Sequence, residues 1–123
     1  MENEKKLIML VDDNPANLRI GKNVLSEKYF VATAPSAAKL FSLLKNNHPS
    51  IILLDIDMPD MDGYMTLKAL RQKDETKDIP VIFLTGMTDT KTEEKCLAMG
   101  AVGYITKPFD PAMLIAYIEK HAL

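Results

Sequence analysis

The chain has 123 residues, of which 47% are hydrophobic and 26% are charged, and its formal net charge is -2. These values are typical of one compact globular domain and exclude a disordered segment, so we expect a single domain over residues 1–123. Because lysines and arginines are scattered and not in excess, the composition argues against direct binding of nucleic acid.

The N-terminal segment and the single cysteine indicate where the protein works. Charged residues precede the first short apolar run, and Asp12 and Asp13 follow it, which fits neither a signal peptide nor a membrane span. Cys96 is the only cysteine, so no internal disulfide can form and the chain suits a reducing compartment. We therefore expect a cytoplasmic protein with no membrane partner.

Five short apolar runs recur along the chain, each of the length of a β-strand. They are Leu7–Val11, Phe30–Ala34, Ile51–Leu54, Val81–Leu84 and Val102–Ile105. Other stretches carry apolar residues three and four positions apart, which is typical of amphipathic helices. The clearest are Ala37, Leu40, Phe41 and Leu44, and later Met113, Leu114, Tyr117 and Ile118. Asn14 before Pro15 and Ser36 suit helix N-caps, and Gly100 suits a helix end.

The alternation of strands and helices predicts an α/β fold with a doubly wound sheet of five parallel strands, because each helix returns the chain to the same edge. Ligands of such sheets bind beyond the carboxyl ends of the strands, where the strand order reverses. Four of the five runs end in polar residues that would gather there: Asp12 and Asp13, Asp55 and Asp57, Thr85, and Lys107. The second run ends in Ala34 and Pro35, which suits an edge strand in the order 2-1-3-4-5.

Three carboxylates from two neighbouring strand ends would form an oxygen-rich site suited to a hard divalent cation. These are Asp12, Asp13 and Asp55. Mg²⁺ is favoured, with Mn²⁺ as the alternative, because Mg²⁺ takes few carboxylates, keeps bound waters and leaves positions for phosphate oxygens. With the ammonium of Lys107 and the hydroxyl of Thr85 nearby, the site has what the transfer of a phosphoryl group onto an aspartate requires.

Four motifs together resemble the receiver domain of two-component response regulators, and the resemblance covers essentially the whole chain. They are VDDN (Val11 to Asn14), LLDIDMPDMDG (Leu53 to Gly63), FLTG (Phe83 to Gly86) and YITKPF (Tyr104 to Phe109). The resemblance implies a flavodoxin-like (βα)5 receiver fold with strand order 2-1-3-4-5. It also implies a phosphoacceptor function in two-component or phosphorelay signalling.

The resemblance assigns a role to each aspartate at the strand ends. Asp55 would be the phosphoacceptor. Asp13 and Asp55 would bind Mg²⁺ directly, and Asp12 would act mostly through a bound water. The backbone carbonyl of Asp57 would complete the protein ligands.

The resemblance also assigns roles to the residues after the fourth and fifth strands. Lys107 would pair with the phosphoryl oxygens, aimed by a cis peptide bond before Pro108, a minority state of X-Pro bonds. Thr85 would bond a phosphoryl oxygen once Asp55 is modified, and Tyr104 would swing into the space that the threonine vacates. Thr85 and Tyr104 are therefore the expected switch residues.

The implied partners follow from the same family. The phosphoryl donor would be the phosphohistidine of a sensor histidine kinase or of a histidine phosphotransfer protein, and the group would later be lost to water. The domain would catalyse only its own phosphorylation and dephosphorylation. Its output would be a change on the surface of the fourth helix, fifth strand and fifth helix, which would control an output domain or effector, or form a homodimer. The end at Leu123, where the fifth helix should finish, favours a receiver excised from a larger regulator.

The acidic stretch from Ile51 to Gly63 has other interpretations. Asp60 and Asp62 are expected to be solvated or to cap a helix, because the loop has turn residues. A calcium-binding loop aligned on Gly63 would place Met58 and Ala69 at ligand positions, which excludes it. Two alternatives remain. One is an aspartate-based phosphohydrolase of the haloacid dehalogenase type, although in that class the pair of aspartates follows the first strand and here Asp55 and Asp57 follow the third. The other is a binding-only receiver.

Overall fold

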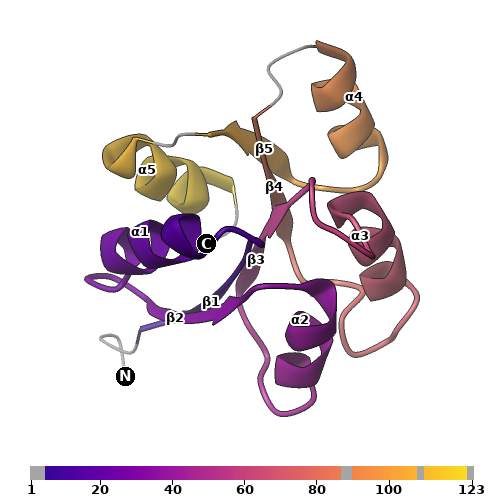
Figure 1. The fold of residues 1–123 in the computed structure, drawn as a ribbon, viewed down its shortest axis with the longest axis horizontal. Helices are drawn as coiled ribbons and strands as arrows, with labels where there is room; N and C mark the ends of the chain where they lie inside the picture. The colour runs from indigo at the N-terminus through magenta and orange to yellow at the C-terminus, as the bar shows by residue number, and fades with distance from the viewer. Residues whose placement is uncertain (1–4, 87–89, 108–109, 122–123) are drawn as a thin grey trace.

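The computed structural model describes residues 5–86, 90–107 and 110–121, in which five strands alternate with five helices (Figure 1). In chain order the elements are β1 (Leu7–Val11), α1 (Pro15–Leu25), β2 (Phe30–Ala34), α2 (Ala37–Leu44), β3 (Ile51–Asp55), α3 (Gly63–Arg71), β4 (Val81–Thr85), α4 (Thr90–Ala98), β5 (Gly103–Thr106) and α5 (Pro111–His121). The strands β1 and β2 have the predicted bounds. β3 and β4 run one residue further than predicted, and β5 begins and ends one residue later.

The five strands form one parallel sheet in the order β2-β1-β3-β4-β5, which confirms the predicted fold class and strand order. Figure 1 shows α1 and α5 on one face of the sheet and α2, α3 and α4 on the other. The strand order reverses beside β1, so the crevice between the ends of β1 and β3 is where such a sheet binds its ligand.

Both faces of the sheet are apolar because the three central strands are covered by helices on each side. Alternate residues of these strands enter two separate cores. The core under α2, α3 and α4 contains Met9, Val11, Ile52, Leu54, Val81 and Phe83, and the core under α1 and α5 contains Ile8, Leu10, Ile51, Leu53, Ile82 and Leu84. β2 lies at the edge of the sheet, as predicted from its end without polar residues, and it is only partly buried.

The helix starts and ends have the capping residues that the sequence predicted. The side chains of Asn14, Ser36 and Asp62 accept backbone N–H groups in the first turns of α1, α2 and α3, which satisfies donors that a helix start leaves without partners. Gly100, just after α4, has a φ of 98°, a conformation that costs glycine little.

The helix α5 lies where the spacing of Met113, Leu114, Tyr117 and Ile118 predicted an amphipathic helix. Leu114 and Ile118 are buried, whereas Met113 is 71% exposed. The buried stripe of α5 is therefore narrower than its sequence pattern.

Among the helices that the structure describes, none is both long and apolar enough to cross a membrane.

Candidate functional site

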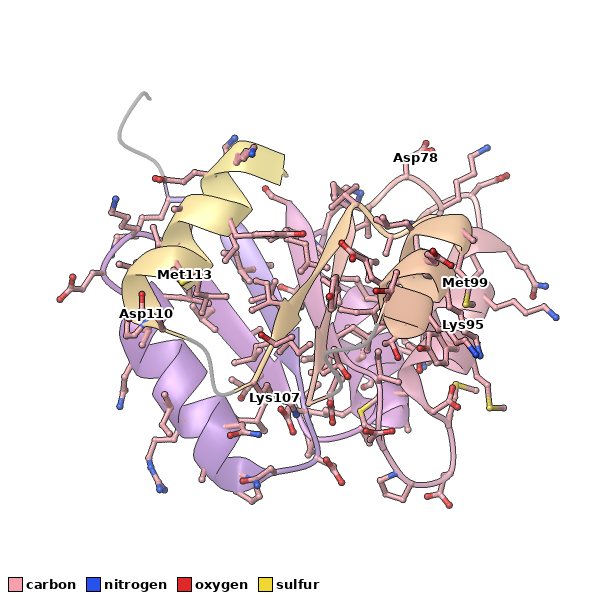
Figure 2. The ribbon with its side chains drawn as sticks, turned by 90° about the horizontal axis from the view of Figure 1, so that it is seen from above. Asp78, Lys95, Met99, Lys107, Asp110 and Met113 are labelled. Carbon is pink, nitrogen blue, oxygen red and sulfur yellow. The ribbon has the colours of Figure 1, made fainter. Side chains whose placement is uncertain are left out.

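The register of the sheet brings the predicted residues to one edge. Val11 pairs with Leu54, so the next residues, Asp12 and Asp55, leave β1 and β3 at the same level. Thr85 pairs with Thr106 at the ends of β4 and β5, and Lys107 follows directly. Figure 2 shows Lys107 at the end of β5, beside the ends of the neighbouring strands.

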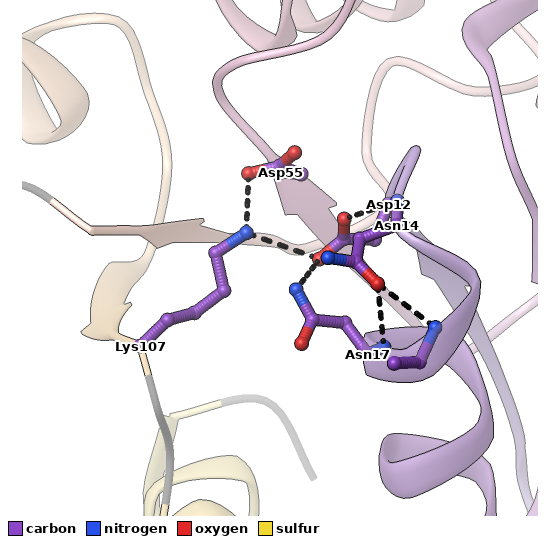
Figure 3. A network of polar contacts seen from close by, with 6 residues as sticks. Asp12, Asn14, Asn17, Asp55 and Lys107 are labelled. Carbon is purple, nitrogen blue, oxygen red and sulfur yellow. Dashed lines mark hydrogen bonds and ion pairs between the residues drawn. The ribbon is translucent and has the colours of Figure 1, made fainter.

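A lysine bridges two buried carboxylates at the centre of this edge (Figure 3). Lys107 Nζ lies 2.9 Å from Asp55 Oδ1 and 3.1 Å from Asp12 Oδ2. Asp12 is fully buried and Asp55 is 2% exposed, so neither carboxylate is solvated by bulk water. Carboxylates are buried at this depth only when they are paired and hydrogen-bonded, and the lysine provides both.

Backbone hydrogen bonds fix the main-chain positions of Asp12 and Lys107. The backbone N–H of Asp12 donates to the carbonyl of Ala34 at 3.1 Å, which anchors the residue against the end of β2. The backbone N–H of Lys107 donates to the carbonyl of Thr85 at 2.7 Å, which ties the start of the lysine to the end of β4. The long lysine side chain therefore begins at a fixed point and reaches back to the two carboxylates.

The charges of the site perturb one another. Burial raises the pKa of Asp55 to about 6; the hydrogen bond from Lys107 opposes this rise, and the negative charge of Asp12 adds to it. Burial would lower the pKa of the Lys107 ammonium, but its hydrogen bonds to Asp55 and Asp12 outweigh burial, so that pKa is raised. The lysine is thus held charged, and Asp55 is ionised above pH 6 at a cost in stability.

The same edge has the donor set of a divalent-cation site. Asp12, Asp13 and Asp55 each offer one carboxylate oxygen, and these oxygens all lie within 4.8 Å of one another. Asp13 is exposed, which leaves one side of the cluster open to water. Hard oxygen ligands with an open side fit Mg²⁺, which keeps part of its water shell.

The remaining predicted residues lie around this centre. Thr85 is fully buried at the end of β4, and Tyr104 is half-buried in β5, where it pairs with Phe83. Asp57 is exposed in the loop after β3. The predicted cis bond falls at Pro108, which lies outside the described residues.

Of the loop aspartates, Asp62 caps α3, with its carboxylate accepting from the backbone N–H of Met65 at 2.9 Å. Asp60 has a φ of 68°, a turn conformation that aspartate tolerates better than most residues. The expectation that Asp60 and Asp62 are solvated or cap a helix agrees with the capping contact of Asp62.

Sequence reasoning missed one residue of this network. The side-chain amide of Asn17 donates to Asp12 Oδ2 at 3.1 Å. Asn17 is the third residue of α1, counted from Pro15, a position from which side chains can reach back past the helix start. A polar residue at that helix position was the signal that could have identified it.

Comparison with known proteins identifies the family. The sequence matches the response regulator receiver domain over residues 8–119. It is 38% identical over 121 residues to a probable transcriptional regulator ycf27 of Cyanophora paradoxa, covering 98% of this chain and 49% of that protein. This chain spans between 25% and 49% of the length of several curated relatives that it matches.

Solved structures agree with this assignment. The chemotaxis protein CheY4 of Vibrio cholerae superposes with a TM-score of 0.90 at 26% identity, covering 96% of this chain and 99% of that one. The receiver domain of the sensor histidine kinase PA1611 of Pseudomonas aeruginosa PAO1, with a magnesium ion coordinated in its active site cleft, has a TM-score of 0.85 at 27% identity, with coverages of 96% and 98%.

The chain therefore belongs to the response regulator receiver family and has that family's phosphoacceptor signalling role. Receiver domains act together with histidine kinases and output domains. The comparisons do not favour the phosphohydrolase alternative.

Proposed function

We propose that Asp55 is the residue that accepts the phosphoryl group. The observation that carries this proposal is the ion pair of Lys107 with Asp55, at 2.9 Å, at the strand edge where the fold binds ligands. A carboxylate oxygen of Asp55 attacks the phosphorus of a donor phosphohistidine, an O–P bond forms, and the P–N bond to the imidazole breaks. Lys107 then faces the transferred group and offsets its negative charge.

Residues of this chain would also hold Mg²⁺. Asp13 and Asp55 are proposed as direct ligands, Asp12 as a ligand through water, and Asp57 through its backbone carbonyl. When bound, the cation would neutralise charge that develops on the phosphoryl oxygens. The magnesium ion coordinated in the Pseudomonas receiver domain supports this part of the proposal.

The proposed output lies on the surface of α4, β5 and α5. Thr85 would bond the phosphoryl oxygen and Tyr104 would move inward, which would shift an equilibrium that exists before phosphorylation. Exposed apolar side chains on α4 and α5, those of Leu97 and Met113, suit docking of an output domain, an effector or a second copy. Proposed donors are a sensor histidine kinase or a histidine phosphotransfer protein, and the proposed compartment is the cytoplasm.

The test is the intact mass of the protein after incubation with acetyl phosphate, with and without Mg²⁺. We expect one added phosphoryl group that requires Mg²⁺, is released by hydroxylamine and is absent from Asp55→Asn. Asp60→Asn is the matched control, because Asp60 is an exposed carboxylate of the same loop to which no role in the site is assigned, and this variant should still be modified. No adduct on the folded protein would favour a binding-only receiver. Steady turnover of a phosphate ester would favour a hydrolase.

A further inference from the structure

The buried carboxylate of Asp12 receives three hydrogen bonds, two from residues at the start of α1 and one from Lys107 after β5 (Figure 3). Its Oδ1 accepts from the backbone N–H of Asn14 at 2.9 Å. Its Oδ2 accepts from the side-chain amide of Asn17 at 3.1 Å and from Lys107 Nζ at 3.1 Å. Because a carboxylate can only accept hydrogen bonds, the amide nitrogen of Asn17 is the atom that must face it.

These three donors differ in whether they stay hydrogen-bonded to Asp12 during the proposed phosphoryl transfer. The Asn14 donor is backbone and is fixed by the start of α1, where the Asn14 side chain caps the N–H of Ala16 at 2.8 Å. Lys107 is shared with Asp55, and the proposed chemistry draws it toward the phosphoryl group. The Asn17 amide is the side-chain donor to Asp12 that takes no part in that chemistry.

We propose that Asn17 is a positioning residue that holds the Asp12 carboxylate in the orientation needed for Mg²⁺, including when Lys107 turns to the phosphoryl group. This inference rests on the proposed function, since it assumes that Asp12 serves the cation. Asn17 does not touch the reacting atoms and acts through Asp12. The role is analogous to the outer hydrogen bonds that orient metal ligands elsewhere in proteins.

Loss of the hydrogen bond from Asn17 would leave the Asp12 carboxylate less constrained. In Asn17→Leu, a side chain of similar shape has no donor, so Asp12 Oδ2 keeps only Lys107. The carboxylate can then rotate about the remaining backbone contact, and Lys107 is bound more firmly to Asp12. The site must reorder the carboxylate when the cation binds, which weakens Mg²⁺ binding.

The experiment is a calorimetric titration of Mg²⁺ into the whole chain at fixed pH. The variants are Asn17→Leu, the smaller Asn17→Ala, and Asn17→Gln, which keeps an amide donor. Asn23→Leu is the matched control, because Asn23 is an exposed residue of the same helix. Phosphorylation by acetyl phosphate is followed over a range of Mg²⁺ concentrations, and melting of the metal-free protein reports stability.

We expect the Leu and Ala variants to bind Mg²⁺ about tenfold more weakly, the usual lower effect of removing such an outer contact. The half-saturating Mg²⁺ concentration for phosphorylation should rise by the same factor while the plateau rate changes little. The Gln variant should recover most of the affinity, and Asn23→Leu should match the parent.

Two results would overturn the proposal. One is unchanged Mg²⁺ affinity in both the Leu and the Ala variants. The other is a loss of affinity that follows a lower melting temperature and is not recovered by Gln, because that pattern indicates a structural role only. If the parent protein itself bound no Mg²⁺, that result would contradict the proposed cation site, on which the role of Asn17 rests.

Discussion

Replacing Asp55 by asparagine should stabilise the metal-free protein at neutral pH. The carboxylate is 2% exposed, and burial raises its pKa from an ordinary value of 3.8 to about 6, although Lys107 is 2.9 Å away. A shift of roughly two units corresponds to about 3 kcal/mol, at 1.36 kcal/mol for each unit, by which ionised Asp55 destabilises the fold. An amide of the same shape carries no charge and avoids that cost.

The sign of the pH dependence follows from the direction of the shift. A carboxyl group with a higher pKa in the folded than in the unfolded protein binds its proton more tightly when folded, so raising the pH costs stability. Asp55 is protonated in both states below pH 3.8 and ionised in both well above pH 6. The advantage of Asp55→Asn should therefore grow between these values and stay constant above them.

The assay is urea unfolding of both proteins in a chelator, from pH 4 to pH 8. Because the shifted pKa of Asp55 already contains the attraction of Lys107, we expect a gain of about 3 kcal/mol at pH 7.5. The gain should vanish near pH 4. Adding Mg²⁺ at pH 7.5 should narrow the difference, since a cation that binds the native parent stabilises it. An equal or lower stability of the variant at pH 7.5 would refute the reasoning that burial dominates this site.

Further predictions concern close contacts and the lysine bridge. In Gly63→Ala the new Cβ would lie 2.5 Å from the backbone oxygen of the last residue of β3, so we expect a loss of about 1–3 kcal/mol in urea unfolding and slower phosphorylation; normal values for both would contradict this. In Gly103→Ala the new Cβ would lie 2.7 Å from Tyr117 Cε1, and a similar loss is expected. Gly86→Ala should be neutral, because no atom of the described residues lies within 4 Å of the new Cβ. Lys107→Met should cost about 3 kcal/mol at pH 7.5 because two buried carboxylates lose their cation, and this loss should shrink toward pH 5 as a carboxyl protonates. A pH-independent loss would count against that cause.

The sequence predicted the architecture well because the pattern that specifies it is local. Five apolar runs bounded by turn and cap residues fixed the strands to within one residue, and the parallel arrangement then determined which ends meet. Asp12, Asp55 and Lys107 converge for that reason, although 95 residues separate the first from the last. Chain direction and strand order suffice to bring such residues together.

The details that could not be predicted depend on side-chain packing. Apolar spacing gives the direction of a helix face but not its width, so it does not show that Met113 of α5 is 71% exposed. The contact of Asn17 with Asp12 depends on how α1 leaves the sheet. Gly103 reads as an ordinary strand residue, yet it leaves room for the ring of Tyr117, whose hydroxyl accepts the backbone N–H of Tyr104 at 3.0 Å.

The central claim is that Asp55 itself carries the phosphoryl group. The most direct measurement is borohydride reduction of the protein phosphorylated with acetyl phosphate and Mg²⁺, followed by peptide sequencing in a mass spectrometer. Reduction of an aspartyl phosphate converts that aspartate to homoserine, so the modified position is read without any mutation. We expect homoserine at position 55 alone. Homoserine at Asp12, Asp13 or Asp57, or none in a protein that carries the added phosphoryl mass, would contradict it.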